Sequence, residues 1–448
     1  MQTEKNNTTI QTSSLTGIQT SLVTGLKRKS SEYTPLCRTI TKQLTKKFKK
    51  QNGIYFTPPT TIDHILTDVL AKQILKMEAP TILEPSCGSC QFIKRLRNSF
   101  SHISHITGVE KCPQIYQHVK DLADSKTTIL NQDFFAFQSN TKYDLIVGNP
   151  PYFQMKKQDV EEEYLKFIDG RPNAYVVFLL KSLSLLKENG VLSFVLPSTF
   201  LSCVSFDKTR RFISQNFIIL GVEKCNDKYL ETSQKTVVLT LQKQANLTKH
   251  NNQFTWKTGG DRRLVFGQKA DIAKLKALSN KATTFAEMGF KVSLGHISWK
   301  KNIEFLTDNP KCPRIIYNSD IDANKMRVGK SKKSAKKHHI DVGKAKLKAI
   351  QGPFLLVNRG DRSGNYNFKH CFIEEGTGLF VVEKQLLLVQ HDEHAGEHNK
   401  NICVLAAKSL ANPKTREFID LYLHDSVVSP VDFRHIFPFF HSSPNFKI

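Results

Sequence analysis

The sequence predicts an α/β fold with a mostly parallel sheet in its first half, followed by a separate domain in its second half. Between residues 81 and 241, short and continuously apolar runs alternate with stretches of helical character. Strands that are apolar along their whole length are typical of a parallel sheet covered by helices on both faces. Beyond about residue 250 the alternation stops, which predicts a second domain of α+β or irregular structure.

The apolar runs of the first half are the expected strands. They lie at residues 81–83, 105–109, 127–130, 143–147, 191–196, 217–222 and 235–241. The expected helices lie at residues 91–96, 113–123 and 174–187, and a further helix ends near residue 215. Glu188-Asn189-Gly190 is typical of a helix stop, and Pro197 closes the strand at 191–196.

Composition divides the chain into three parts. Residues 1–35 form an expected flexible tail, because they are rich in Thr, Ser, Gln and Asn and have few apolar anchors. Residues 36–245 are the expected first domain, and residues 250–448 the expected second domain. The segment from Leu36 to Lys50 turns basic, which fits either a solvated helix face or a phosphate-contacting lead-in to the core.

The chain is strongly basic. It has 448 residues, and 65 Lys and Arg residues against 40 Asp and Glu residues give a formal net charge of +25. A protein this basic usually meets a polyanion, and nucleic acid is the first candidate. The alternative is a charge that serves solubility or forms a ribosome-type accessory surface. Lys332, Lys333, Lys336 and Lys337 cluster in an expected loop, where their ammonium groups would contact phosphates.

No pattern in the sequence predicts export, a membrane span or a metal centre. No run approaches 18 apolar residues, and the polar N-terminus has no apolar h-region. The nine cysteines are odd in number and scattered, so we expect free thiols in a reducing, intracellular compartment. Cys87 and Cys90 have C-x-x-C spacing, but no second pair follows at the spacing of a zinc site.

Acidic residues follow three successive expected strands. Glu84 ends the first strand before a tight turn through Gly88, Glu110 ends the second, and Asp133 follows the third. Because parallel strands end at one edge of a sheet, these carboxylates should face one ligand. Glu110 is placed to bind ribose hydroxyls, and Asp133 to meet an adenine amino group. The pattern predicts a cofactor that contains a nucleoside.

The segment Asn149-Pro150-Pro151-Tyr152 follows the fourth expected strand. Two consecutive prolines stiffen this loop. The side-chain carbonyl of Asn149 and the backbone carbonyl of Pro150 can accept both hydrogens of an exocyclic amine, which turns the amine's lone pair towards an electrophile. Tyr152 offers a face on which a planar base can stack.

With these motifs in this order, the chain resembles the S-adenosylmethionine-dependent amino methyltransferases, and among them the gamma-class N6-adenine DNA methyltransferases of restriction–modification type. The resemblance covers roughly residues 45–245 and is fainter beyond. It implies a Rossmann-like catalytic domain and a C-terminal α+β target-recognition domain. The residues that it implies for binding S-adenosylmethionine are Tyr55, Thr57, Glu84, Pro85, Gly88, Glu110, Asp133, Phe134, Asn149 and Phe178.

The resemblance also implies a reaction. Double-stranded DNA would be held mainly through its phosphates, and the target adenine would flip out and stack between Tyr152 and Tyr229. Its N6 atom would attack the methyl group of the cofactor, with Asn149 and Pro150 as hydrogen-bond acceptors. Tyr229 is assigned by its spacing from the strand at 235–241, and an ordinary half-buried tyrosine is the alternative.

Two other functions stay open at this point. Asn-Pro-Pro-Tyr also serves enzymes that methylate a release-factor glutamine or some RNA guanines, although these generally lack a large basic domain after the catalytic one. A non-enzymatic DNA-binding specificity subunit is the other, and the intact catalytic loop argues against it.

A cognate restriction endonuclease is a further expected partner, and we expect a monomer or weak dimer. Cys90 occupies a position where many relatives carry Gly, which predicts a tighter or differently closed cofactor loop.

Overall fold

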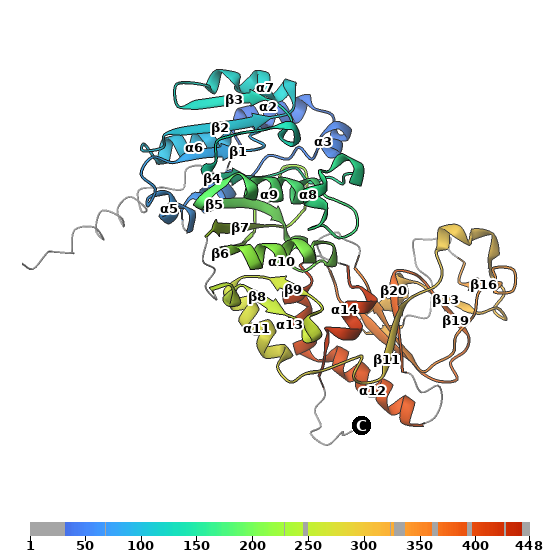
Figure 1. The fold of residues 1–448 in the computed structure, drawn as a ribbon. Coiled ribbons are helices and arrows are strands. Elements are labelled where there is room, and N and C mark those ends of the chain that lie inside the picture. Colours follow the sequence, from blue (N-terminus) through green and yellow to red (C-terminus); the bar gives the residue numbers. More distant parts are fainter. Residues whose placement is uncertain are drawn as a thin grey trace, which may run out of the picture. The chain divides into compact units, whose positions relative to one another are not determined.

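The chain divides into two compact units in a computed structural model (Figure 1). Unit 1 comprises Met1–Pro197 and Phe212–Asn251, and unit 2 comprises Ser198–Arg211 and Asn252–Ile448. The residues that the structure describes are 32–67, 69–227, 229–244, 250–322, 324–326, 337–360, 366–391, 397–424 and 427–440.

A mostly parallel sheet of seven strands forms the centre of unit 1, in the order β3-β2-β1-β4-β5-β7-β6. Its strands are β1 (Thr81–Glu84), β2 (His105–Glu110), β3 (Thr127–Asn131), β4 (Tyr143–Gly148), β5 (Leu186–Pro197), β6 (Phe217–Cys225) and β7 (Thr236–Lys243). β1 to β5 are parallel, and the strand order reverses direction between β1 and β4. This reversal is the position at which open α/β sheets bind ligands at the carboxyl ends of the strands. The predicted fold class is confirmed.

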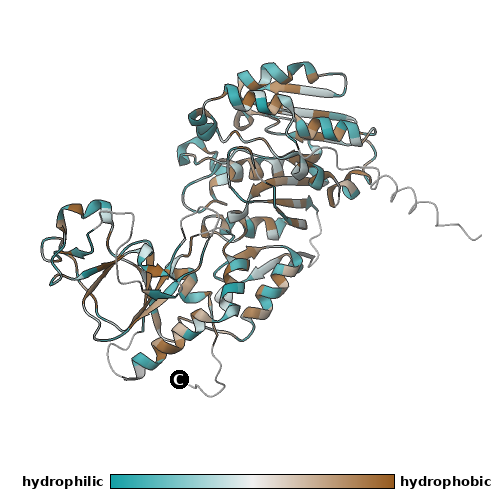
Figure 2. Ribbon diagram, turned by 180° about the vertical axis from the view of Figure 1, so that it is seen from behind, coloured by the Kyte–Doolittle hydropathy of each residue, from teal (hydrophilic) through white to brown (hydrophobic). Residues whose placement is uncertain are grey.

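The helices of unit 1 lie along this sheet (Figure 1). They are α2 (Pro35–Gln43), α3 (Lys46–Asn52), α4 (Pro59–Thr67), α5 (Val69–Ile74), α6 (Gln91–Ser99), α7 (Pro113–Val119), α8 (Glu162–Leu165) and α9 (Ala174–Ser184), and the second half of α10 (Asp207–Asn216) also belongs to unit 1. Apolar side chains of α4, α5 and α6 pack with those of β1, β4 and β5 in one core cluster. The central strands are mainly hydrophobic, whereas the helices mix hydrophilic and hydrophobic residues (Figure 2).

Three details of unit 1 differ from the sequence-based expectations. β7 runs antiparallel to β5 and β6, because β6 and β7 are joined without a crossover helix, which a parallel pair requires. α9 ends at Ser184, and β5 starts at Leu186 rather than 191. The expected helix stop is an irregularity in β5, where Asn189 takes a φ of +61°. Asparagine tolerates this left-handed conformation better than most residues.

Only the last residues of the predicted tail, 32–35, lie in the part of the chain that the structure describes. Residues 1–31 lie outside the described residues. Thr34 caps α2 by accepting a hydrogen bond from the backbone N–H of Cys37, so Pro35 is the first residue of a helix.

Unit 2 is an α+β structure built from short strands and a few helices. Its helices are α11 (Lys269–Ser279), α12 (Glu397–Ala411), α13 (Pro413–Tyr422) and α14 (Pro430–His435). One four-stranded sheet contains β11 (Phe290–Leu294), β20 (Leu386–His391), β17 (Phe354–Asn358) and β18 (His370–Ile373), and another contains β12 (Leu306–Thr307), β16 (His339–Ile340), β13 (Arg314–Ile316) and β19 (Phe380–Val382). Smaller pairs are β8 (Thr255–Lys257) with β9 (Leu264–Phe266), β10 (Thr283–Thr284) with β21 (Pro438–Phe439), and β14 (Ile321–Asp322) with β15 (Lys325–Met326).

Residues 198–211 belong to unit 2, although they fall within the first domain predicted from the sequence. A fully buried arginine, Arg210, explains why. Its guanidinium donates to the backbone carbonyls of Phe200 and Leu264 and to the carboxylate of Asp207. Asp207 also accepts the N–H of Leu264 at 2.8 Å. A buried charge that is paired and hydrogen-bonded in this way cannot leave its partners without a large cost.

None of the helices in the described ranges is long and apolar enough to cross a membrane. All nine cysteines lie in described segments and are free, as the sequence predicts.

Candidate active site

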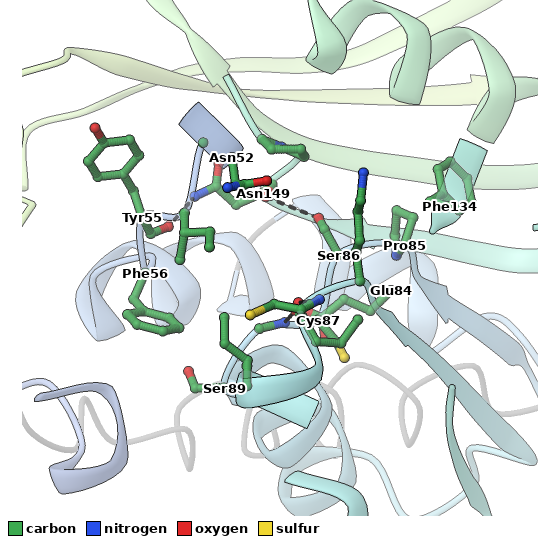
Figure 3. A pocket seen from close by; sticks show the side chains of 18 of the residues that line it. Asn52, Tyr55, Phe56, Glu84, Pro85, Ser86, Cys87, Ser89, Phe134 and Asn149 are labelled. Carbon is green, nitrogen blue, oxygen red and sulfur yellow. Dashed lines mark hydrogen bonds between the residues drawn. The ribbon is translucent and has the colours of Figure 1, made fainter. Parts of the chain in front are cut away.

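A cavity of about 240 Å³ opens at the carboxyl ends of the parallel strands of unit 1 (Figure 3). Its walls come from the segment around α3, the loop after β1, the ends of β2 and β3, the loop after β4, and α9. The structure brings together here all the residues that the resemblance implies for the cofactor: Tyr55, Thr57, Glu84, Pro85, Gly88, Glu110, Asp133, Phe134, Asn149 and Phe178.

Glu84 contributes a buried carboxyl group to the lining of this pocket. It is the last residue of β1 and is 2% exposed. Burial raises the pKa of this carboxyl well above its usual range, and the nearby Cys90 and Glu110 raise it further. Its Oε2 atom has no hydrogen-bond partner among the described residues. A buried polar atom without a partner is costly, so this oxygen is suited to a donor supplied by a ligand.

Glu110 holds the loop after β1 in place. Its Oε2 accepts the N–H of Gly88 at 2.9 Å, and its Oε1 accepts the N–H of Cys112 at 2.7 Å. Burial raises the pKa of Glu110 to about 7, and the two backbone N–H groups oppose that rise. Each carboxylate oxygen retains an acceptor site, so Glu110 can still accept hydrogen bonds from ribose hydroxyls.

Cys90 closes the cofactor loop in an unusual conformation. Its φ of +56° and ψ of +33° lie in the left-handed region, immediately before α6. Its N–H donates to the carbonyl of Cys87 at 2.7 Å, which tightens the turn. Glycine adopts this conformation without the steric cost of a Cβ atom, so a cysteine at this position stores strain. Among the described residues, no group of three or more His, Cys, Asp or Glu side chains is placed to hold a metal ion.

An aromatic wall lies beside Asp133. The rings of Phe134 and Phe178 are 4.8 Å apart between centroids, and those of Phe135 and Phe178 are 5.0 Å apart. Asp133 accepts the N–H of Phe135 at 3.0 Å and pairs with Lys111 at 2.8 Å. An aromatic wall with an acceptor beside it suits a purine ring that carries an amino group.

The side chain of Asn149 lies at the pocket and is held from several sides (Figure 3). Its Nδ2 donates to the carbonyl of Tyr55 at 3.4 Å, and its Oδ1 accepts the hydroxyl of Tyr152 at 2.7 Å. Its backbone carbonyl accepts the hydroxyl of Ser86 at 3.1 Å. The carbonyl oxygen of an amide has two lone pairs, so Oδ1 can accept one further hydrogen bond.

Pro150, Tyr152 and Tyr229 do not line the cavity. The hydroxyl of Tyr152 also lies 2.9 Å from the carbonyl of Val195, and its ring packs edge-on against Tyr175. Tyr229 is 8% exposed and is therefore more buried than a half-buried tyrosine. The predicted stacking roles of both tyrosines stay predictions.

Three of the lysines predicted to contact phosphates lie outside the described residues, namely Lys332, Lys333 and Lys336. The fourth, Lys337, is exposed. Its Nζ atom donates to the carbonyl of Leu306 at 3.5 Å and lies 3.7 Å from Asp308.

The structure adds contacts that the sequence analysis missed. Lys49 on α3 is only 5% exposed; its ammonium donates to the carbonyl of Thr41 at 2.7 Å and pairs with Glu231 at 2.6 Å. No sequence pattern distinguishes Lys49 from the lysines beside it. Ser86 could have been noticed, because it directly follows the Glu84-Pro85 motif.

Comparison with known proteins gives matches over the catalytic segment and over nearly the whole chain. Residues 65–229 match the family described as Eco57I restriction-modification methylase. The Type II methyltransferase M.CvrRI of Paramecium bursaria Chlorella virus XZ-6E is 25% identical over 87% of this chain and 94% of its own length. Modification methylase CviBIII of Paramecium bursaria Chlorella virus NC1A is 24% identical over 89% and 96%, respectively. The Type II methyltransferase M.TthHB8I of Thermus thermophilus is 31% identical over 31% of this chain and 35% of its length.

The sheet and its pocket are those of a Rossmann-like methyltransferase, and S-adenosylmethionine is the cofactor. Within that class, the chain is similar to DNA methyltransferases of restriction–modification type, both over its catalytic segment and over most of its length.

Proposed function

We propose that this methyltransferase modifies the N6 atom of a flipped-out adenine at a specific sequence in double-stranded DNA. The observation that supports this proposal is the arrangement around Asn149. Its side chain lies at the cofactor pocket, is held on both sides by Tyr55 and Tyr152, and keeps one acceptor position on Oδ1. An acceptor fixed in this way suits an exocyclic amine.

The pocket residues would hold the cofactor by its separate chemical parts. Glu84, with its unpartnered oxygen, would accept a hydrogen bond from the amino group of the methionine portion. Glu110 would accept the ribose hydroxyls, and Asp133 with Phe178 would bind the adenine. When bound, S-adenosylmethionine supplies an electrophilic methyl group on its sulfonium sulfur.

The residues of the catalytic loop would activate the acceptor amine. Oδ1 of Asn149 and the carbonyl of Pro150 would each accept one hydrogen of the N6 amino group, so that the lone pair on N6 is no longer shared with the ring. Tyr152 would orient Asn149 through its hydroxyl and support the base with its ring. Tyr229 would provide the opposite face. The target-recognition role proposed for residues 250–448 would select the sequence.

The direct test is expression of the gene followed by sequencing of modified bases in the DNA of the host. The proposal expects N6-methyladenine at one sequence context. With the purified protein, a radioactive cofactor should label duplex DNA and should not label RNA or protein. Label in RNA or on a protein glutamine, with none in DNA, would replace the proposed substrate. Failure to bind S-adenosylmethionine would favour a non-enzymatic specificity subunit.

Replacement of Asn149 by Ala tests the catalytic assignment. We expect turnover to fall by at least about a hundredfold, the effect of removing one fixed polar group from an active site. The affinity for S-adenosylmethionine, measured by calorimetry, should change little. Asn140→Ala is the matched control, because Asn140 is exposed and does not line the pocket. Normal turnover in Asn149→Ala would remove the central element of the mechanism.

We further propose that a restriction endonuclease with the same sequence specificity accompanies this protein inside the cell. Support comes from the name of one relative, the Type II restriction enzyme and methyltransferase RM.Eco57I of Escherichia coli, which is 32% identical over 21% of this chain. We also propose that the protein acts as a monomer or weak dimer. The partnership is tested by asking whether methylated DNA resists digestion by the product of a neighbouring gene. Sedimentation of the purified protein tests the oligomeric state.

A further inference from the structure

The exposed face of α3 is a basic surface beside the catalytic loop. α3 has the sequence Lys-Lys-Phe-Lys-Lys-Gln-Asn, and its first turn contains no acidic residue. Lys46, Lys47 and Lys50 are exposed, and none of them pairs with a carboxylate among the residues that the structure describes. Lys50 is four residues from Lys46 and three from Lys47, so the three ammonium groups share one face of the helix. Like charges at these spacings destabilise a helix.

α3 lies at the rim of the cofactor pocket. Phe48 and Asn52, on another face of the helix, line the cavity, and Phe48 is also 37% exposed. The rim position brings the lysines near the opening, because a helix of seven residues is only about 10 Å long.

The end of α3 contacts the catalytic loop directly. A Cβ atom on Gly53, the C-cap of α3, would lie 2.7 Å from the backbone nitrogen of Tyr152 and 2.9 Å from Cβ of Pro151. Two residues later, the carbonyl of Tyr55 accepts the side chain of Asn149. The lysines therefore belong to an element that touches the loop on which the acceptor base would be held.

α3 is also fixed in position rather than being a loose basic segment. Thr45 caps its start by accepting the N–H of Phe48 at 3.2 Å. The buried Lys49, which flanks the exposed lysines on the helix, donates to the carbonyl of Thr41 at 2.7 Å and pairs with Glu231 at 2.6 Å. Lys49 thus fixes α3 in position, and the three exposed lysines extend from a helix that is held in place.

We propose that Lys46, Lys47 and Lys50 bind the DNA phosphates that flank the flipped nucleotide. This inference rests on the proposed function, because a base captured by Asn149 is still linked to its backbone, and its neighbouring phosphates must pass close to the catalytic loop. Lysine ammonium groups contact phosphates without reading sequence. The surface therefore contributes affinity and holds the extruded nucleotide, but does not select the target.

The test compares two triple variants of equal charge change. Lys46→Gln, Lys47→Gln and Lys50→Gln are combined in one protein, and Lys76→Gln, Lys120→Gln and Lys126→Gln in a control. The control lysines are exposed and precede β1 or β3, at the sheet edge opposite the pocket. The α3 triple should flatten the log–log salt dependence of DNA binding by about 2.7, at roughly 0.9 per phosphate contact. The control should leave it near that of the wild type.

A second measurement places the contacts. The duplex carries the methylated site found by modified-base sequencing, with neutral methylphosphonates replacing the phosphates on either side of the target adenine. Wild type and control should bind this duplex more weakly than the unmodified duplex. The α3 triple, which already lacks the lysines, should bind the two duplexes with nearly the same affinity. Equal losses in all three proteins, or a salt slope in the α3 triple equal to that of the control, would overturn the inference. If the wild type fails to methylate DNA, the proposed function itself is wrong.

Discussion

Glu110 has a structural role in the pocket and a proposed role in binding the cofactor. It holds the backbone of Gly88 and Cys112, and it is also the acid proposed to receive the ribose hydroxyls. Because burial raises its pKa to about 7, a large part of the cofactor-free protein carries a protonated Glu110 at neutral pH. Protonation removes the negative charge and one of the acceptor positions that the ribose requires.

Cofactor affinity should therefore depend on pH around this pKa. As the pH rises from 6 to 8, Glu110 loses its proton and the affinity for S-adenosylhomocysteine should increase, by up to about tenfold, since one pKa unit corresponds to a factor of ten. The stability of the cofactor-free protein should move the other way. A raised carboxyl pKa means that the folded state binds more protons between pH 4.5 and 7, so this contribution to stability is lost as the pH rises through that range. Calorimetry at several pH values is the measurement, and Glu110→Gln, which should lose the part of each dependence that Glu110 contributes, is the control.

Tyr229 is a buried residue that is also proposed to stack on the target base. Its hydroxyl is 3.5 Å from Oγ1 of Thr236, a marginal hydrogen bond, so Tyr229→Phe should cost little. If its ring captures the target base, Tyr229→Ala should shift base flipping by roughly 5-fold to 150-fold, because stacking on one face is worth about 1–3 kcal/mol. Fluorescence of 2-aminopurine at the target position reports flipping.

The comparison for Tyr229 is its neighbour Leu230, which is 45% exposed in the same loop. A loss of flipping in Leu230→Ala with none in Tyr229→Ala would move the stacking role to the exposed residue. Unchanged fluorescence and turnover in Tyr229→Ala would show that this tyrosine is only part of the core.

At the scale of an element, the join between α3 and the catalytic loop depends on one glycine. Gly53 has a φ of +64°, and a Cβ atom there would also collide with Pro151 and Tyr152. Gly53→Ala should lower stability by about 1–2 kcal/mol from backbone strain and should in addition displace the catalytic loop and reduce turnover. Gly170→Ala is the matched control, because Gly170 has a φ of +69° but no atom within 4 Å of the added methyl group. Denaturation midpoints measure the loss of stability, and turnover is measured on the same two variants. Equal turnover in the two variants would show that the contact between Gly53 and the loop has no effect on activity.

The first half of the fold could be predicted because its signals are local. β1 to β4 are short apolar runs, each followed by its functional residues, and parallel strands bring such residues to one edge without further information. The direction of a strand relative to its neighbours was harder to predict, as the antiparallel β7 shows. An apolar run has the same pattern whichever way the strand runs in the sheet. In unit 2, β13 has three residues and pairs with both β16 and β19, which lie far along the chain. Strands this short contain too little periodicity to reveal their partners.

Residues of the candidate site could be predicted where the residue type and its motif indicate one kind of chemistry. They were missed where only the packing of the folded chain determines what the side chain contacts. Asn149 and Glu110 stand in motifs whose spacing already implies their positions. Cys90 could be recognised as a departure, but its left-handed backbone could not be read from a cysteine. Lys49 is one of four lysines in α3, and only the packing of that helix buries it against Glu231.

At the scale of the whole molecule, the net charge of +25 favours phosphate contacts as the main source of affinity for DNA. The exposed face of α3 is one candidate place, and the lysine-rich stretch that contains Lys332, Lys333, Lys336 and Lys337 is another. Of these four, Lys337 is described, and its contact with Asp308 joins two largely exposed groups, which contributes little stability. Its ammonium is thus available to a phosphate at low cost.

Neutralising these four lysines together to Gln should weaken DNA binding without changing the methylated sequence. If all four contact phosphates, the log–log salt slope should flatten by about three to four, at roughly 0.9 per contact. A fourfold control at Lys76, Lys120, Lys126 and Lys142, which are exposed and precede strands of unit 1, removes the same charge from elsewhere. A slope equal to that of the control would show that the stretch is a solvated loop with no contact to DNA. A changed methylation sequence would show instead that these side chains reach the bases, since phosphate contacts contain no sequence information.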